Sequence, residues 1–138
     1  TGFTNTDYTH AMTVSDLDID NDGDIDIITG GYKLIWYENN GSESFTGHTI
    51  DTNGAWSTYV VDLDSDGDMD VASVSGGDPI YWYENNGSQS FTSNTIISNA
   101  GVTRSVHSID VDGDGDMDVL SASENNDKIA WYENSLIH

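Results

Sequence analysis

The hydrophobic positions of this chain fall in short runs of β-branched and aromatic residues, separated by turns rich in Gly, Asn, Asp and Ser. No segment repeats its apolar residues with the period of a helix, and the single proline, Pro79, lies in a turn. The predicted strands of the second and third thirds of the chain lie at residues 45–50, 58–63, 70–75, 80–85, 91–97, 105–111, 118–123 and 128–134. The pattern therefore predicts an all-β chain.

Three sequence patterns recur in a fixed order and divide the chain into repeats. A Phe-Thr pair comes first, then a tract of alternating aspartates, then the segment Trp-Tyr-Glu-Asn. The pairs begin at Phe3, Phe45 and Phe91, and the four-residue segments begin at Trp36, Trp82 and Trp131. Self-similarity of this kind indicates a repeat protein. We expect one repeat domain over residues 1–138, with units at about 1–39, 40–85 and 86–138.

The run Ile80-Tyr81-Trp82-Tyr83 has a large side chain at every position. Successive side chains of a strand point to opposite faces of the sheet, so both faces of this strand should be covered by protein. The three recurring tryptophans are accordingly expected in the core between neighbouring units. Four-stranded antiparallel sheets that stack radially form a β-propeller, and the predicted fold is therefore three propeller blades of four strands each.

The aspartate tracts have the spacing of a calcium-binding loop. Aspartates occupy positions 1, 3, 5, 7 and 9 of each tract, and a glycine at position 6 permits a sharp turn. Ca²⁺ takes roughly six to eight oxygen ligands, which the side chains at 1, 3, 5 and 9 and the carbonyl at 7 could supply. The candidate metal ligands are Asp18, Asp20, Asp22, Asp24, Asp26, Asp62, Asp64, Asp66, Asp68, Asp70, Asp110, Asp112, Asp114, Asp116 and Asp118. We expect about three Ca²⁺ per chain, and the absence of Glu at position 12 argues against an EF-hand.

The charge of the chain supports a metal-binding role and excludes other classes. The net charge is −22, from 25 acidic and 3 basic residues. Such a chain would repel nucleic acids and anionic membranes. It has no cysteine, and no apolar run approaches the length of a membrane span. Loops of this type suit the millimolar calcium found outside cells, so we expect an extracellular protein, secreted or at the cell surface.

The spacing D-x-D-x-D-G-x-x-D between two strands, repeated in each unit, resembles the FG-GAP/VCBS repeats of integrin α-subunits and secreted bacterial proteins. The literal Phe-Gly…Gly-Ala-Pro sequence is absent, so the resemblance is closer to the bacterial form. The resemblance implies propeller blades that hold Ca²⁺ in the hairpin loop between two strands. It does not imply one particular function.

Three blades are fewer than the number that closes a propeller, which is typically about four to eight. Two copies would supply six, so we expect either a homodimer that closes a six-bladed ring or a fragment of a longer propeller. In the dimer, residues 3–9 could add the last strand of the partner's final blade.

No catalytic constellation emerges from the sequence, and we expect a binding protein rather than an enzyme. The four histidines do not recur with the repeat, and Glu38, Glu84 and Glu133 recur at one repeat position, which favours a structural role. The non-recurring Trp56 is a candidate for sugar stacking or partner contact, although loop packing is the simpler and preferred interpretation. The expected function is that of a calcium-stabilised propeller module for recognition of, or adhesion to, a glycan or protein. The alternative is a non-catalytic accessory segment of a larger secreted protein, such as a polysaccharide-degrading enzyme.

Overall fold

The computed structural model describes residues 9–13, 17–77 and 79–135, and these form three antiparallel sheets without a helix. The first sheet contains β1 (Thr9–Thr13), β2 (Ile27–Gly31), β3 (Leu34–Asn39) and β4 (Phe45–Asp51). The second contains β5 (Ser57–Val61), β6 (Asp70–Val74), β7 (Ile80–Asn85) and β8 (Phe91–Ile97). The third contains β9 (Thr103–Ile109), β10 (Asp118–Ser123) and β11 (Lys128–Tyr132). The described part of the chain holds no helix long and apolar enough to cross a membrane.

Each sheet is a meander in which consecutive strands pair. The spatial order is β1-β2-β3-β4 in the first sheet and β5-β6-β7-β8 in the second. The Trp-Tyr-Glu-Asn strand pairs in the same register in both: Trp36 lies opposite His48, and Trp82 lies opposite Asn94. The two sheets are therefore built alike from their repeated sequence.

The third sheet has three strands within the described residues, ordered β9-β10-β11, rather than the four that were predicted. In the other two sheets the fourth strand is the Phe-Thr strand that follows Trp-Tyr-Glu-Asn. The described part of the chain ends one residue after Asn134, so this strand has no counterpart beside β11. The Phe3-Thr4 pair lies outside the described residues. The same is true of residues 3–8 of the 3–9 segment that was predicted to add a strand to a partner chain.

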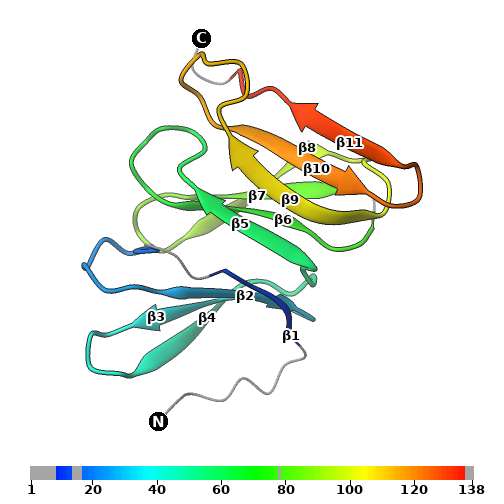
Figure 1. The fold of residues 1–138 in the computed structure, drawn as a ribbon. Helices are drawn as coiled ribbons and strands as arrows, with labels where there is room; N and C mark the ends of the chain where they lie inside the picture. The colour runs from blue at the N-terminus through cyan, green and yellow to red at the C-terminus, as the bar shows by residue number, and fades with distance from the viewer. Residues whose placement is uncertain (1–8, 14–16, 78, 136–138) are drawn as a thin grey trace.

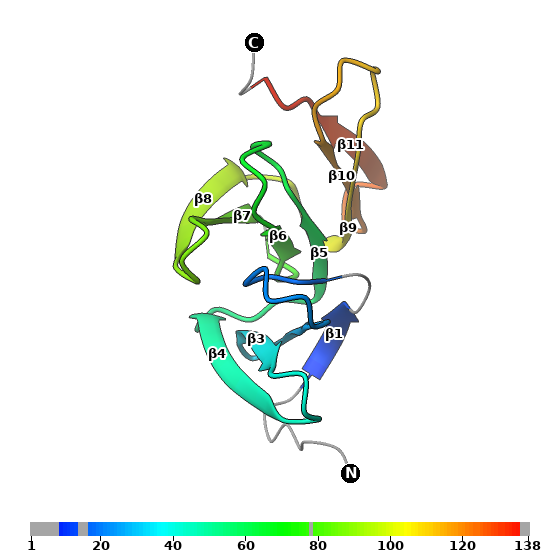
Figure 2. The same ribbon diagram turned by 90° about the vertical axis from the view of Figure 1, so that its left-hand side faces the viewer.

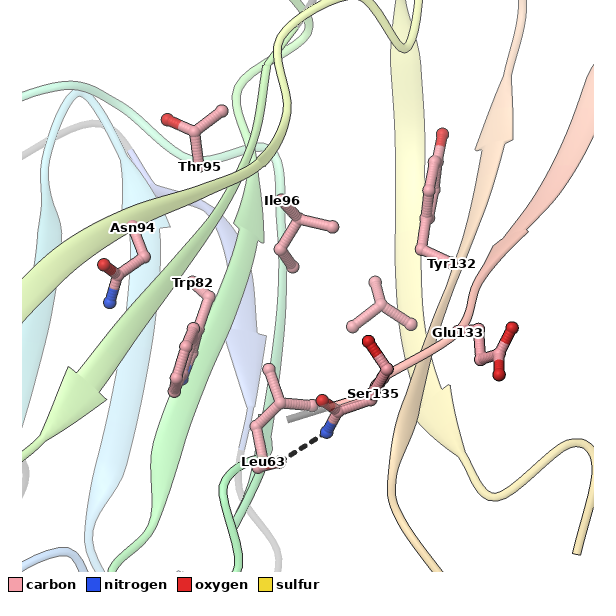
Figure 3. Close-up of a pocket in the computed structure, with 10 residues that line it drawn as sticks. Leu63, Trp82, Asn94, Thr95, Ile96, Tyr132, Glu133 and Ser135 are labelled. Carbon is pink, nitrogen blue, oxygen red and sulfur yellow. Dashed lines mark hydrogen bonds between the residues drawn. The ribbon is translucent and has the colours of Figure 1, made fainter. Parts of the chain in front are cut away.

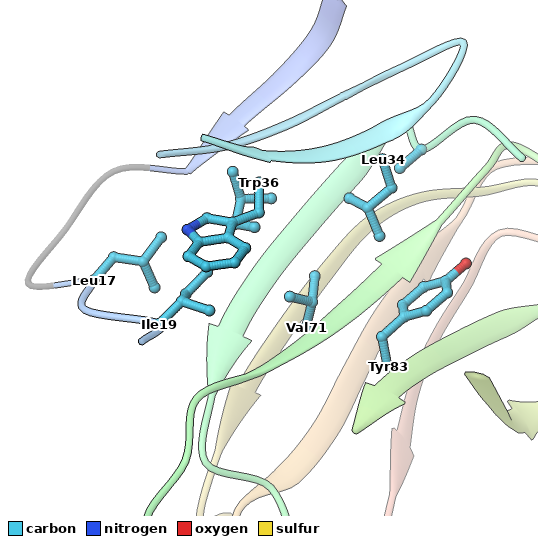
Figure 4. Close-up of a cluster of buried hydrophobic side chains, with 8 residues drawn as sticks. Leu17, Ile19, Leu34, Trp36, Val71 and Tyr83 are labelled. Atoms are coloured by element: carbon cyan, nitrogen blue, oxygen red, sulfur yellow. The ribbon is translucent and has the colours of Figure 1, made fainter. Parts of the chain in front are cut away.

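The three sheets follow one another face to face, as Figures 1 and 2 show from two directions. The first strands of the sheets, β1, β5 and β9, lie closest together. One apolar core separates the first and second sheets and includes Leu34, Trp36, Val71 and Tyr83 (Figure 4). A second core separates the second and third sheets and includes Val74 and Ile80.

The predicted strands agree closely with the observed ones, and the strand β7 has both faces covered as expected. Ile80 belongs to the core shared with the third sheet, and Tyr83 to the core shared with the first. The grouping of strands differs from the predicted units, because the Phe-Thr strands β4 and β8 pair with the Trp-Tyr-Glu-Asn strand that precedes them. A short hairpin turn joins each such pair, whereas the segment that follows β4 or β8 leads to the first strand of the next sheet.

Candidate metal centres

Each aspartate tract forms a loop between the first and second strands of its sheet, and the loop winds tightly because two of its residues have positive φ. At position 6 the glycines Gly23, Gly67 and Gly115 have φ of 94°, 98° and 103°. Only glycine adopts such angles without strain. The residue at position 4 also has a left-handed backbone conformation, with φ of 60° at Asn21 and 61° at Ser65. This backbone turns the side chains of alternate residues towards the inside of the loop.

The carboxylates of each loop converge on a point where a cation fits. In each of three groups, one oxygen from every residue lies within 4.8 Å of the others. Ca²⁺–oxygen distances are roughly 2.3–2.6 Å. Two ligand oxygens on opposite sides of one ion are therefore separated by about twice that distance, which agrees with the 4.8 Å limit. The groups are Asp18, Asp20 and Asp22; Asp62, Asp64 and Asp66; and Asp110, Asp112 and Asp118. The first two groups use positions 1, 3 and 5, and the third uses position 9 in place of position 5.

The aspartate at position 1 fixes the loop by accepting backbone hydrogen bonds with both oxygens. The N–H groups of Asp22 and Gly23 donate to Asp18 at 2.9 and 2.8 Å. The corresponding N–H groups of Asp66 and Gly67 donate to Asp62 at 3.1 and 3.0 Å. The loop is thus held in shape by its own backbone, which lowers the entropic cost of binding an ion.

The aspartate at position 3 is in an unfavourable environment for a negative charge in all three loops. Burial, together with repulsion from Asp22 and Asp26, raises the pKa of Asp20 to about 6. Desolvation and the neighbouring position-5 carboxylate also raise the pKa of Asp64 and of Asp112. The buried Oδ1 of Asp20 accepts no hydrogen bond from the described residues. A divalent cation would offset both the repulsion and the unmet hydrogen-bonding capacity.

The aspartate at position 9 has a structural role that the sequence did not reveal. Asp70 is fully buried, and it accepts hydrogen bonds from the N–H of Leu63 at 3.0 Å and of Asn85 at 2.7 Å. Asp26 bonds the N–H of Ile19 and Asn39 in the same way. These carboxylates join the start of the loop to the Trp-Tyr-Glu-Asn strand. Burial raises the pKa of Asp70 to about 6, against the lowering effect of those two hydrogen bonds.

The asparagines that end the second and third Trp-Tyr-Glu-Asn segments link neighbouring sheets. The side-chain amide of Asn85 donates to the Ile19 carbonyl of the first sheet's loop at 3.1 Å and to the Met69 carbonyl of its own loop at 3.3 Å. Asn134 repeats this arrangement one sheet further, donating to Leu63 O at 2.6 Å and Met117 O at 3.2 Å. We call this repeated contact the asparagine latch. The latch joins the aspartate loop of one sheet to the sheet that follows it.

A hollow of about 300 Å³ lies between the second and third sheets (Figure 3). Its lining includes the rings of Trp82 and Tyr132 and the side chain of Asn94, whereas the Glu133 side chain at its edge points away from the second sheet. At the equivalent place between the first and second sheets, His48 stacks on Trp36 with ring centroids 4.6 Å apart, and Trp36 is buried. Replacement of this histidine by Asn94 leaves the second junction more open.

The remaining sequence candidates have packing partners. The Arg104 guanidinium lies 4.3 Å from the centre of the Trp56 ring, and the ring also lies against Gly76. Trp56 is therefore a packed loop residue in this structure. Glu38 bonds His48 at 2.7 Å and Glu84 bonds Asn94 at 3.3 Å, which agrees with a structural role for the recurring glutamates.

Comparison with known proteins gives two findings. The model of the FG-GAP-like repeat matches residues 18–73 and again residues 62–121. A solved structure of similar fold comes from work on the specific recognition of non-reducing terminal N-acetylglucosamine by an Agrocybe aegerita lectin, with a TM-score of 0.57 and 20% sequence identity. The similarity covers 82% of this chain but 33% of the lectin chain, so the chain spans about a third of that protein. No curated protein matches the chain.

Proposed function

Since the chain belongs to the FG-GAP-like repeat family, we propose that it is an extracellular calcium-binding module of the β-propeller type that recognises glycans. Calcium is proposed to hold the three loops, and recognition is assigned to the surface between sheets. The module binds its ligand and does not transform it.

The calcium assignment rests on one observation, the convergence of three carboxylates in each of the three loops. Hard carboxylate oxygens are the ligands that Ca²⁺ prefers, whereas Zn²⁺ sites favour histidine and cysteine. The net charge of −22 supports the same assignment, because three divalent ions would relieve repulsion that the 3 basic residues cannot. The extracellular location follows from the calcium concentration that such loops need.

Calcium binding is tested by thermal unfolding with calcium, with magnesium and with a chelator. At tenfold excess over its dissociation constant, each ion would contribute about 1.4 kcal/mol, and three independent ions about 4 kcal/mol. For a chain of this length that corresponds to a rise in Tm of about 15 °C. Equal melting temperatures in calcium and in chelator would contradict the assignment.

The glycan assignment is supported by the similarity of fold to the lectin and by the hollow between the second and third sheets. A sugar has an apolar face of C–H groups and a rim of hydroxyls. The rings of Trp82 and Tyr132 match the apolar face, and the amide of Asn94 can bond the hydroxyl rim. The hollow is thus suited to a carbohydrate more than to a purely apolar ligand.

Glycan binding is tested on an array of immobilised glycans that includes terminal N-acetylglucosamine, in millimolar calcium. Asn94→Ala should reduce binding by about three- to tenfold, since it removes a hydrogen-bonding amide from the hollow. His48→Ala is the matched control, because His48 has the same repeat position as Asn94 but does not line the hollow. Absence of binding to any glycan would favour the alternative of a structural segment in a larger secreted protein. Release of a cleaved product would contradict a role limited to binding.

A further inference from the structure

The outer face of the third sheet exposes apolar side chains that are buried at the equivalent places of the first sheet. Ile129 is 83% exposed and Trp131 is 45% exposed. Their counterparts, Leu34 and Trp36, are 0% and 1% exposed because the second sheet covers them. The loop that precedes β10 repeats the difference: Val111 is exposed, whereas its counterparts Ile19 and Leu63 are buried. This face therefore has the side chains of a sheet-to-sheet junction.

The outer face of the first sheet has the residues that form the other half of such a junction. Within the chain, the second sheet meets the first through Met69, Val71, Tyr83 and Asn85. The counterparts in the first sheet are Ile25, Ile27, Tyr37 and Asn39. No sheet covers them within the described residues, and Ile25 is 48% exposed.

The asparagine latch is also half complete at this face. Asn39 donates to the Ile25 carbonyl of its own loop at 3.0 Å, as Asn85 does to Met69. Asn85 and Asn134 each make a second bond, to the position-2 carbonyl of the preceding loop. Among the described residues, no preceding loop lies beside Asn39, and no following sheet bonds the position-2 carbonyl of Val111. The chain thus carries both halves of one more latch at its two ends.

We propose that a second copy of this chain is the partner of these faces: the third sheet of one copy packs on the first sheet of the other, and Asn39 bonds the partner's Val111 carbonyl. The same contact made twice closes the pair with two-fold symmetry and brings together six sheets, within the usual range of β-propellers. This interaction does not depend on the glycan proposal, because neither face includes the hollow between the second and third sheets.

The charge of the chain sets the conditions under which the pair forms. Two chains of net charge −22 repel each other, and three Ca²⁺ on each would reduce the charge to −16. Salt screens the remaining repulsion over about 8–10 Å at physiological ionic strength. Association should therefore be stronger in calcium and at higher ionic strength, the reverse of the salt dependence of a charge-driven complex.

The first test is molar mass by sedimentation velocity and light scattering at micromolar protein in calcium and moderate salt. Wild type should have twice the 15.0 kDa of one chain. Ile129→Asp should raise the dissociation constant by at least about tenfold, because the junction would bury an unpaired carboxylate. Since Ile129 is exposed in one chain, this variant should fold normally. Ser93→Asp adds the same charge to the exposed edge strand β8 and should leave the dimer intact.

The second test asks which faces meet, and the absence of native cysteine makes it direct. Asn85 bonds the carbonyls of residues 19 and 69 together, so their counterparts at 111 and 25 should be neighbours across the junction. A short thiol-specific cross-linker should join Ile25→Cys chains to Val111→Cys chains in a mixture, but join neither variant to itself. A monomeric wild type in calcium would overturn the proposal and favour further repeats as the partner. A dimer that Ile129→Asp leaves unchanged, or cross-linking of either variant to itself, would overturn it as well.

Discussion

Replacement of Asn85 by alanine tests whether the asparagine latch holds neighbouring sheets together. The side chain is fully buried and makes three hydrogen bonds. Its amide donates to the carbonyls of Ile19 and Met69, and its Oδ1 accepts from the N–H of Gly87 at 3.2 Å. Alanine removes all three and leaves the Ile19 carbonyl, between two packed sheets, without a partner.

The expected cost follows from the surroundings of each lost bond. A buried carbonyl left unsatisfied costs about 1–3 kcal/mol, and a hydrogen bond whose partner can reach water costs about 1 kcal/mol. Ile19 is buried, whereas Met69 is partly exposed and Gly87 is exposed. The sum is about 3–5 kcal/mol, a large fraction of the net stability of a small domain.

Urea unfolding in saturating calcium measures this cost, with protein dilute enough to be monomeric. With an m-value of about 2 kcal/mol/M, Asn85→Ala should lower the midpoint by about 1.5–2.5 M. Asn39→Ala is the matched control, since the same side chain there makes bonds only within its own sheet among the described residues. Its cost should be about 1–2 kcal/mol. Equal losses for the two variants would refute the view that the bond to Ile19 joins the sheets.

Three further predictions concern the loops. Asp64→Ala should reduce the calcium bound per chain from three ions to two, because it removes the ligand oxygens of the middle carboxylate of one loop only; calorimetric titration measures the count, and three ions would contradict the assignment. Gly67→Ala should cost about 1–2 kcal/mol in urea unfolding because φ is +98° there, whereas Gly77→Ala, with no positive φ and open surroundings, should be nearly neutral. The pKa of Asp20 is raised to about 6 in the folded calcium-free protein. The Asp20 carboxylate therefore binds a proton more tightly in the folded protein than in the unfolded chain. Calcium-free stability should therefore rise as pH falls from about 6 to 4, while calcium affinity falls because protons compete for the same oxygens; a pH-independent affinity would contradict this.

The strands and the convergence of the aspartates were predictable because both depend on local sequence. Alternating β-branched and aromatic residues locate β7 and β8 to within a residue, and a glycine between aspartates signals a tight loop. The repetition of each pattern in three places removes most of the ambiguity of a single short run.

The features that the sequence did not reveal depend on contacts between distant residues. Asn85 and Ile19 are 66 residues apart, and Asn134 and Leu63 are 71 apart, so no local pattern announces the latch. The structural role of Asp70 was hidden for a similar reason, since its spacing in the tract also suits a metal ligand. The prediction that recurring tryptophans are buried is confirmed for Trp36 but is wrong for Trp131, because no sheet covers the outer face of β11 within the described residues.

The number of calcium ions bound per chain tests the central claim most directly. The protein would be stripped with a chelator, dialysed against buffered calcium at neutral pH, and assayed for bound metal by mass spectrometry. The three carboxylate groups predict three ions per chain, retained in the presence of excess magnesium. A chain that keeps its fold and binds no calcium would contradict the account.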